Sequence, residues 1–543
     1  MMALFFCFGL LLATVPAGSA GQASLSYRIS GIVVDAVTGA PVASAELSIS
    51  EGPEQTKTTS GDDGRFVFQE VNTGKYQLSA TARGYVREGF NQHGPYSSGI
   101  AVGVGLDSEH VIFRLHPQAV IAGRVTDEHG EAVRQAQVML FSTESTTGRH
   151  ARFVQAQMQT NDLGEYRFAG LQAGRYYVAV VARPWYAQTG LSEVPERGGS
   201  SSRLMGVRGK PDPSLDVVYP ITFYPGVTAE PAAGELNLSA GEKDEADIHL
   251  QAVPAVHVRL RNMPMDVQSG IQIAANQKLF GSLDMGLRVV SGQITPGEYE
   301  VAGLPPGDVA LVVNQSGNQE WNSRTIKANV SEGDTLNGGE TGALVNVSGR
   351  VTFSVENARP EKEQITLVSD DNSSAYAKLR KDGTFSFAPL QEGTYKVFMN
   401  LAGSDEYVAK VSATGAKTFG REVTIAGAGD VQLSVTMGHG RGQVTGVANV
   451  DGKATSGVMI LLVPDSGQNL SEDSRLDQSD SDGTFALGRI LPGKYLLLAI
   501  EDGWDIEWTN WTALKPYLEK GKTLQISANE QKKVAVDVQH KMK

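Results

Sequence analysis

The stretch Asp162–Val178, DLGEYRFAGLQAGRYYV, recurs along the chain with fixed spacing. Counted from its first glycine, it has an aromatic residue at +2, an apolar one at +4, an aliphatic one at +7, a second glycine at +10 and a tyrosine at +12. Only the third of five copies lacks the tyrosine, with Val309 there instead. Self-similarity of this kind indicates a small structural unit repeated in tandem. The glycine pairs are Gly64/Gly74, Gly164/Gly174, Gly297/Gly307, Gly383/Gly393 and Gly483/Gly493.

The spacing within each copy predicts two strands joined by short turns. Asp-Gly or Pro-Gly at the start is typical of a turn, because glycine adopts positive φ without steric cost. Residues at +2 and +4 share one face of a strand, since side chains alternate with period two. We therefore expect Phe66, Phe168, Phe387 and Phe485 to lie in a core, and Gly64, Gly164, Gly383 and Gly483 to form turns.

The recurring tyrosine predicts a specific hydrogen bond. A tyrosine that opens a late strand of a sandwich often donates its hydroxyl to the backbone a few residues upstream. The upstream connection is irregular here, so its backbone groups need such partners. The structural tyrosines predicted in this way are Tyr76, Tyr176, Tyr395 and Tyr495.

Length and composition place the chain among ordinary globular proteins. The 543 residues are too many for one core, and 41% hydrophobic with 20% charged residues do not suit disorder. The net charge of −13 argues against nucleic acid as a partner, because nucleic-acid binding needs a basic surface.

The amino terminus predicts export. An apolar run, Ala3–Val15, is followed by Pro16 and the small residues AGSA, so residues 1–20 are interpreted as a secretory signal peptide. No Lys or Arg precedes the run, and an uncleaved anchor is the alternative. We expect a periplasmic, outer-surface or secreted protein with no transmembrane helix once the signal is removed. The only cysteine, Cys7, lies in this run, so the mature chain would form no disulfide.

The fold class predicted is all-β, with five tandem antiparallel β-sandwich modules. Each module shows about seven short strands separated by turn signals, a pattern that favours a sandwich. The predicted boundaries are 27–115, 119–251 with a long insertion at about 184–226, 252–340 as a degenerate copy, 344–437, and 441–540.

The motifs of these modules resemble a known family. SGRVTF, AGRVTDEHGEAV and the repeat DxGxYxFxxLxxGxYxV are similar to the carboxypeptidase regulatory-like domain, a transthyretin-like β-sandwich that occurs in tandem in bacterial exported proteins. The resemblance is good in the first, second and fifth modules, fair in the fourth and poor in the third. It implies transthyretin-like sandwiches and a fold group described as carbohydrate-binding-like. A fold alone does not imply a function.

Catalytic motifs are missing from the sequence. None of the nine histidines has a glutamate at +3, as a zinc carboxypeptidase would require, and no H-E-x-x-H, G-x-S-x-G or Walker motif occurs. The sequence therefore predicts no catalytic residue, no metal site and no cofactor. The histidines, His93 and His257 among them, are interpreted as ordinary surface or strand residues.

Two kinds of segment are candidates for binding. Asp477–Gly483, DQSDSDG, offers three carboxylates that could hold calcium, although its Asp-Gly favours a turn. Trp504, Trp508 and Trp511 would share one face if their segment were helical, and would then form either a glycan platform or a face packed on the sandwich. The insertion adds the candidate ligand-binding residues Trp185, Tyr186 and Tyr224.

The function predicted is that of a non-catalytic, exported β-sandwich protein that acts as an interaction, adhesion or spacer module. Its partner would be a glycan or another cell-surface protein. The alternatives are a carbohydrate-binding protein that uses the aromatic segments, and an enzyme with an unrecognised site.

Overall fold

A computed structural model describes residues 26–144, 148, 151–192, 212–263, 270–281, 283–316, 321–338, 345–354, 363–369, 374–399, 405–427 and 429–542. In these ranges the strands form eleven sheets, ten of which fall into five consecutive pairs, so the all-β prediction is confirmed. No helix in the described ranges is both long and apolar enough to cross a membrane. The predicted signal peptide and the centre of the insertion lie outside the described residues.

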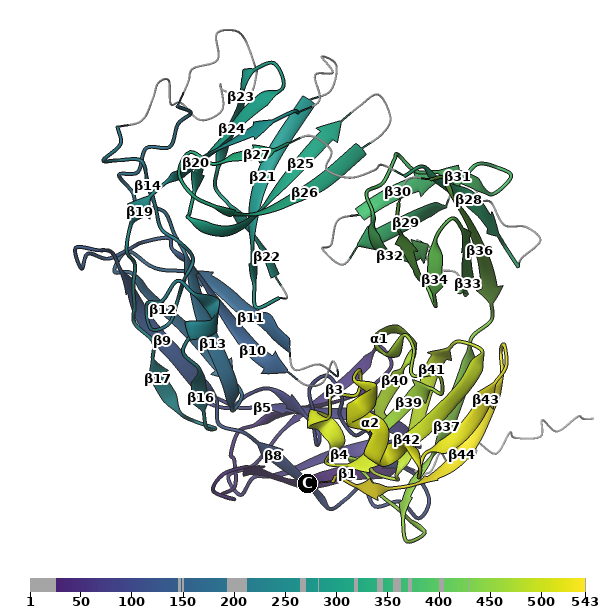
Figure 1. Ribbon diagram of the computed structural model, residues 1–543. Coiled ribbons are helices and arrows are strands. Elements are labelled where there is room, and N and C mark those ends of the chain that lie inside the picture. The colour runs from purple at the N-terminus through teal and green to yellow at the C-terminus, as the bar shows by residue number, and fades with distance from the viewer. Residues whose placement is uncertain are drawn as a thin grey trace, which may run out of the picture.

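We call the five sheet pairs sandwiches 1 to 5, in chain order (Figure 1). Sandwich 1 has the sheets β4-β1-β8 and β3-β2-β5-β6, with β7 also beside β5. Sandwich 2 has β12-β9-β17, with β18 beside β9, and β11-β10-β13-β15, with β16 beside β13. Their strands are β1 (Tyr27–Asp35), β2 (Glu46–Glu51), β3 (Glu54–Thr59), β4 (Arg65–Val71), β5 (Gly74–Thr81), β6 (Glu88–Gly89), β7 (Ile100–Val102), β8 (Val111–Leu115), β9 (Ala119–Thr126), β10 (Gln137–Glu144), β11 (Ala151–Gln159), β12 (Glu165–Leu171), β13 (Gly174–Val181), β15 (Thr222–Phe223), β16 (Leu236–Leu238), β17 (Lys243–Glu245) and β18 (Ile248–His249).

Sandwich 3 has the sheets β23-β24-β20-β27 and β22-β21-β25-β26. A separate two-stranded sheet, β14-β19, links the insertion of sandwich 2 to the start of sandwich 3. A short helix, η2, also precedes sandwich 3. These elements are β14 (Val217–Val218), η2 (Glu230–Ala232), β19 (Val253–Pro254), β20 (Val256–Arg261), β21 (Gly270–Leu279), β22 (Leu283–Leu287), β23 (Val290–Thr295), β24 (Glu298–Leu304), β25 (Gly307–Ser316), β26 (Trp321–Val330) and β27 (Thr335–Asn337).

Sandwich 4 has the sheets β31-β28-β36-β33 and β30-β29-β32-β35-β34. Sandwich 5 has β38-β37-β41, with β44 beside β37, and β40-β39-β42-β43, with β45 beside β42. Their elements are β28 (Val347–Thr352), β29 (Gln364–Ser369), β30 (Ser374–Lys378), β31 (Thr384–Ser386), β32 (Gly393–Met399), β33 (Glu406–Thr414), β34 (Lys417–Phe419), β35 (Glu422–Ile425), β36 (Val431–His439), β37 (Gly442–Val450), β38 (Lys453–Ala454), β39 (Met459–Pro464), α1 (Leu470–Asp473), β40 (Arg475–Gln478), β41 (Thr484–Ile490), β42 (Gly493–Glu501), η4 (Gly503–Asp505), α2 (Trp511–Leu518), β43 (Lys522–Ile526), β44 (Gln531–Asp537) and β45 (Gln539–His540).

Every sandwich contains a parallel strand pair, which the sequence did not predict. The first strand of every sandwich pairs in parallel with a late strand, as β1 does with β8 and β37 with β44. The intervening strands cross to the other sheet, so the chain returns to the first strand running in the same direction. The remaining pairs are antiparallel, as predicted, apart from two short ones, β9 with β18 and β42 with β45.

The repeated aromatic residues lie in the cores, as predicted. Phe66, Phe168, Phe387 and Phe485 are all buried. Residues at +2 and +4 of one strand contact each other edge to face, with ring centroids 6.1 Å apart for Phe66 and Phe68 and 5.6 Å apart for Phe385 and Phe387. Every sandwich has an apolar cluster of its own, which is what the repeated pattern requires.

The four recurring tyrosines make the predicted hydrogen bond. Each hydroxyl donates to the backbone carbonyl four residues upstream, and the partners are Asn72 for Tyr76 (3.2 Å), Gln172 for Tyr176 (2.8 Å), Gln391 for Tyr395 (2.9 Å) and Leu491 for Tyr495 (2.8 Å). The ring packs back over the second glycine of the motif, where a Cβ on Gly493 would lie 3.4 Å from the Tyr495 ring.

The first glycine of each copy takes the left-handed conformation, as predicted. The backbone angle φ is +75° at Gly64, Gly164 and Gly483 and +78° at Gly383. A side chain at these positions would also press on the neighbouring strand, since a Cβ on Gly164 would lie 2.5 Å from the Val125 carbonyl oxygen. Glycine is therefore required at this turn for both its conformation and its size.

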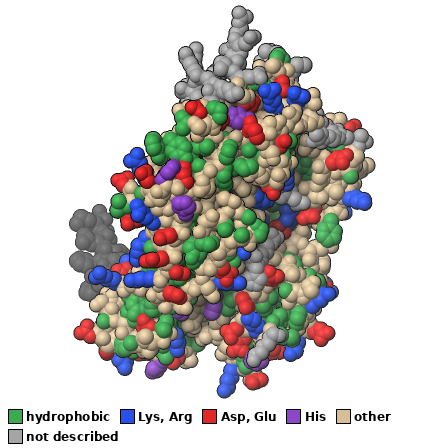
Figure 2. Space-filling model, turned by 60° about the vertical axis from the view of Figure 1, so that its left-hand side comes forward, with side chains coloured by type: hydrophobic (Ala, Val, Ile, Leu, Met, Phe, Trp, Pro, Cys, Tyr) green, Lys and Arg blue, Asp and Glu red, His purple; other side chains and the backbone are tan. Residues whose placement is uncertain are grey.

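The sandwiches follow one another in an arc that closes on itself, so that sandwich 5 lies beside sandwich 1 (Figure 1). Sandwiches 2 and 3 share an apolar cluster, in which Phe141 contacts Phe280 at 4.7 Å between ring centroids. Acidic and basic side chains lie interspersed over the face shown in Figure 2. The division into five independent domains with the boundaries given above remains a prediction.

Candidate functional site

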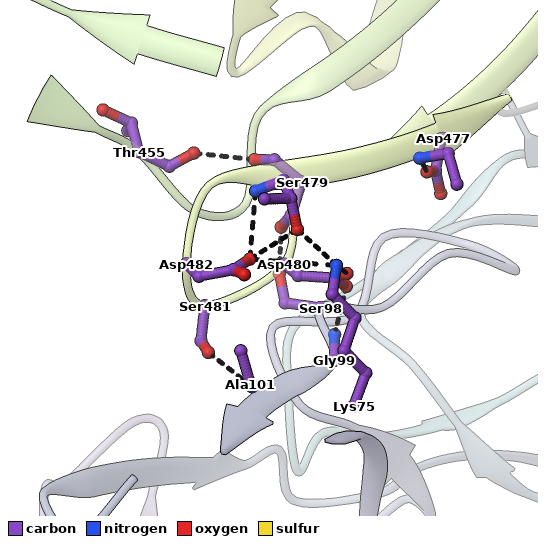
Figure 3. A network of polar contacts seen from close by, with 12 residues as sticks. Lys75, Ser98, Gly99, Ala101, Thr455, Asp477, Ser479, Asp480, Ser481 and Asp482 are labelled. Carbon is purple, nitrogen blue, oxygen red and sulfur yellow. Dashed lines mark hydrogen bonds and ion pairs between the residues drawn. The ribbon is translucent and has the colours of Figure 1, made fainter. Parts of the chain in front are cut away.

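The predicted acidic segment meets sandwich 1 at a contact that we call the terminal joint (Figure 3). Trp504 of the tryptophan segment belongs to the same contact, because it stacks on His93 of sandwich 1. The terminal joint consists of Lys75 and residues 91–101 on sandwich 1 and of residues 477–484 and Trp504 on sandwich 5. Sandwich 1 contributes the start of β5 and the loop that leads into β7. Sandwich 5 contributes the turn between β40 and β41 together with η4.

Backbone groups carry much of the terminal joint. Ser481 donates its backbone N–H to the Gly99 carbonyl at 2.9 Å, and its hydroxyl accepts from the Ala101 N–H at 2.8 Å. The Ser98 hydroxyl donates to the Ser479 carbonyl at 2.8 Å, and both serines are fully buried. Buried polar groups that are paired in this way define one relative position of the two sandwiches.

The Asp480 side chain contributes both an ion pair and a hydrogen bond from the backbone to the terminal joint. One oxygen of Asp480 accepts from the Gly99 N–H at 2.8 Å, and the other lies 2.5 Å from the Lys75 ammonium. Lys75 also donates to the Thr484 hydroxyl and lies 3.8 Å from Asp482. Asp480 thus forms a charge-assisted pair on one side and fixes a loop of sandwich 1 on the other.

The stretch Asp477–Gly483 contains the turn that its Asp-Gly predicts. Gly483 donates its N–H to the Asp480 carbonyl at 2.8 Å, and Asp482 accepts from the Thr484 N–H at 3.0 Å. Asp477 accepts from the Ala486 N–H at 2.8 Å, while burial raises its pKa. The three carboxylates that suggested calcium are therefore already acceptors within the protein.

Gln478 connects three parts of the terminal joint. Its side-chain amide donates to the Asn91 carbonyl at 2.6 Å and to the Ser98 hydroxyl at 2.9 Å, and its carbonyl oxygen lies 3.0 Å from Nδ1 of His93. His93 in turn stacks on Trp504, with ring centroids 4.8 Å apart and planes 5° apart. Trp504 thus contacts another sandwich, and His93 is more than the ordinary surface residue expected of it.

The three tryptophans do not share one face of a helix, because their segment is not one helix. Trp504 lies in η4 and Trp508 in the connection that follows, and α2 begins only at Trp511, where the Asn510 side chain accepts from the Thr512 N–H. Trp508 is 8% exposed and lies against Gly148 of sandwich 2. Together with α2 it covers the outer face of β39 and β42, as the packing alternative predicted.

The insertion of sandwich 2 presents one exposed aromatic ring. Trp185 is 84% exposed and meets Tyr186 edge to face at 5.8 Å between centroids. The Tyr186 hydroxyl donates to Glu128, whose other oxygen accepts from Tyr219 at 2.9 Å. Tyr224 packs against the core of sandwich 2. Of the candidate ligand-binding residues, Trp185 is therefore the one whose ring is open to solvent.

A buried charge cluster, which the sequence reading missed, joins the insertion to sandwich 3. His257 lies between two carboxylates, with Nδ1 2.7 Å from Glu300 and Nε2 2.6 Å from Asp216. Ser192 of the insertion donates both its N–H and its hydroxyl to the fully buried Glu300. These carboxylates raise the pKa of His257 to about 9, so the imidazolium neutralises charge that burial would otherwise disfavour.

One group of possible metal ligands occurs among the described residues, and it was not predicted. Atoms of Asp127, Glu128 and His129 lie within 4.8 Å of one another. Asp127 accepts from the N–H groups of His129 and Glu131 at 2.9 and 2.8 Å, as expected of a turn aspartate. Glu128 accepts from two tyrosine hydroxyls. These oxygens already hold the turn and the insertion in place.

The residues that sequence reasoning missed have weak sequence signals. Lys75 lies at a variable position of the repeated motif, and Ser98 and Gln478 lie outside the motif. Their partners are about 380 or more residues away. Glu300 offered one usable signal, because it is a charged residue in β24 beside the apolar +4 position, Val301. A charge within an otherwise buried strand indicates a paired side chain.

Comparisons with known proteins support the interpretation of the first two sandwiches. The family model described as carboxypeptidase regulatory-like domain matches residues 28–112 and 120–204. These two segments are adjacent, so the match is tandem. No curated protein matches the chain.

Solved structures resemble the chain at low identity. The Bacillus anthracis TIE protein is 9% identical, with 96% of this chain and 75% of that chain covered and a TM-score of 0.17. A streptococcal ancillary pilin is 10% identical, with 57% and 98% covered and a TM-score of 0.19. The major pilin subunit of Bacillus cereus is 10% identical, with 77% and 99% covered and a TM-score of 0.14. TM-scores this low support no conclusion about the function of the present chain.

Proposed function

Because the chain carries tandem carboxypeptidase regulatory-like domains, we propose that it is a non-catalytic, exported protein of the bacterial cell surface or periplasm. Its β-sandwiches would serve as an interaction or adhesion scaffold. The closed arc favours a scaffold over an extended spacer, since the first and last sandwiches are hydrogen-bonded to each other.

The proposal rests on one observation: chemically reactive side chains form contacts between sandwiches. The acidic turn at Asp480, the Trp504 ring and the His257 cluster all connect one sandwich, or its insertion, to another. A catalytic group needs a free face toward a substrate and a matched acid, base or nucleophile. The carboxylate of Asp480, the ring of Trp504 and the imidazole of His257 instead contact other protein groups.

Two measurements on the mature chain test the proposal. Cell fractionation with an antibody against the protein should place it outside the cytoplasm. Panels of peptidase and glycosidase substrates should show no turnover above that of a buffer blank. A cytoplasmic location, or turnover that co-purifies with the chain through several columns, would contradict the proposal.

Carbohydrate binding is the second candidate function, and the exposure of Trp185 favours it. An indole face that is open to solvent can stack on the apolar face of a sugar ring, and Tyr186 holds the neighbouring backbone by its bond to Glu128. A glycan array with the mature chain and with Trp185→Ala tests this function. Signals that the variant retains in full would rule out this ring as the binding surface.

A further inference from the structure

A cavity of about 490 Å³ lies where sandwich 4 meets sandwich 5. Three arginines from different elements line it: Arg421 precedes β35, Arg441 lies between β36 and β37, and Arg489 lies near the end of β41. Phe398 of β32 and Tyr407 of β33 supply aromatic surface. The volume suits a ligand the size of a sugar or smaller.

Two of these arginines carry charge that no described carboxylate neutralises. Arg421 is paired with Asp473 at 2.6 Å. Among the described residues, Arg441 donates only to a backbone carbonyl, that of Glu406, at 3.1 Å, and its buried Nε has no hydrogen-bond partner there. Arg489 forms no ion pair within the described ranges. A buried guanidinium N–H without a partner costs free energy, which an acceptor in the cavity would recover.

A further cation lies behind the cavity wall. The guanidinium of Arg475 donates to the backbone carbonyls of Glu472, Ser474 and Arg489 and forms no ion pair among the described residues. Burial and the nearby charges of Arg441 and Arg489 lower the pKa of Arg475, as expected where like charges gather.

The acidic residues of the cavity do not remove this excess. Asp405 and Glu406 belong to its lining. Burial raises the pKa of Glu406, which disfavours its charged form. The lining thus holds three guanidinium groups, those of Arg421, Arg441 and Arg489, against two carboxyl groups.

We propose that this cavity binds a small oxyanion, a carboxylate or phosphate group, whose ring or apolar portion lies against Phe398 and Tyr407. Arginine presents planar, paired donors that match carboxylate and phosphate oxygens. The 43% exposure of Phe398 leaves aromatic surface beside the cations for the uncharged part of the ligand. This proposal does not rest on the proposed scaffold function, because the cavity lies apart from the terminal joint.

Calorimetric titration of the mature chain at low salt tests the proposal with three probes. Inorganic phosphate and glucuronate represent the two sources of the oxyanion, and glucose is the neutral control. Saturable binding of phosphate alone identifies a phosphate ligand, and saturable binding of glucuronate identifies a carboxylated sugar. Saturable binding of neither anion, or of glucose as strongly as glucuronate, overturns the proposal.

Substitution of the arginines tests whether they bind the anion. Arg489→Gln and Arg441→Gln should each weaken anion binding by at least about tenfold, the loss expected when a hydrogen bond to a charged group is removed. Arg350→Gln is the matched control, because Arg350 lies in sandwich 4, outside the cavity lining, with a 58% exposed side chain that contacts Asp382 through an ion pair at 3.8 Å and a hydrogen bond to its carbonyl at 2.8 Å. Arg489 is exposed, so its replacement leaves the fold intact. Unchanged affinity in both cavity variants would also overturn the proposal.

Discussion

At the scale of single residues, the repeated motif could be predicted because each position has one physical task. The aromatic residues fill cores, the first glycine forms a turn at positive φ, and the tyrosine bonds an irregular connection. The spacing of these positions is enough to assign their roles. The partner of Trp504 could not be predicted in this way, because His93 lies about 400 residues earlier and carries no pattern of its own.

The tyrosine bond leads to a prediction for sandwich 5. Tyr495→Phe should lower the free energy of unfolding by ~0.5–1.5 kcal/mol, because the Leu491 carbonyl loses its donor while the ring remains in place. Urea denaturation followed by tryptophan fluorescence measures this loss, since Trp504, Trp508 and Trp511 all lie in sandwich 5. Tyr376→Phe is the control, because the Tyr376 side chain is exposed. Equal effects of the two changes would argue against the bond.

At the scale of elements, the glycine in four of the five first strands has a reason that the sequence did not reveal. Each of these strands pairs in parallel with a late strand, and the two backbones approach closely at Gly31, Gly123, Gly349 and Gly446. A Cβ on Gly446 would lie 2.3 Å from the Val534 carbonyl oxygen and 2.6 Å from the Phe485 ring. The sequence predicted the strand, but the parallel partner depends on how the chain returns through the second sheet.

Gly446→Ala should therefore strain sandwich 5. The added methyl group must separate β37 from β44 or displace Phe485, which we expect to lower the free energy of unfolding by ~1–3 kcal/mol. Gly488→Ala in β41 is a matched control, because a Cβ there would meet nothing within 4 Å. Urea denaturation of the two variants gives the comparison. If the free energy of unfolding falls no more in Gly446→Ala than in the control, β37 and β44 accommodate the methyl group without loss of stability.

The charge cluster between the insertion and sandwich 3 predicts a pH dependence. The folded pKa of His257, about 9, lies above its ordinary value of 6.5, so its contribution to stability is fully present below pH 6.5 and is lost as the pH rises through about 9. Burial also raises the pKa of Asp216, which acts in the same direction, because a raised folded pKa means that stability is lost as the pH rises.

Denaturation midpoints between pH 6.5 and 9.5 measure this dependence. Stability should fall across that range in the wild-type chain and change little in His257→Gln, which has no charge to lose. A proton NMR titration of the His257 ring should place its pKa well above the ordinary value. Parallel pH profiles in the two proteins, or an ordinary pKa, would contradict the role given to this cluster.

At the scale of the whole molecule, the sequence predicted the units but not their arrangement. Short connections such as GHGRG, Gly438–Gly442, fit either docked or flexible sandwiches. Closure of the arc depends on Lys75, Gly99 and Asp480, whose contacts span about 380 to 405 residues of chain. Such contacts depend on the relative orientations of all five sandwiches, which no local sequence pattern predicts.

Breaking the terminal joint should open the arc without unfolding its parts. Asp480→Ala removes the acceptor of the Gly99 N–H and the partner of Lys75, and a buried donor left without a partner costs about 1–3 kcal/mol. Asp382→Ala is the matched control, since Asp382 lies in the corresponding turn of sandwich 4 and bonds Thr384 within that turn. Small-angle X-ray scattering should show a larger maximum dimension for Asp480→Ala than for either the control or the wild-type chain, while circular dichroism stays the same. Identical scattering from all three proteins would mean that the remaining bonds of Ser98, Ala101 and Gln478 close the arc without this charge. An extended wild-type chain would contradict both the joint and the scaffold function that rests on it.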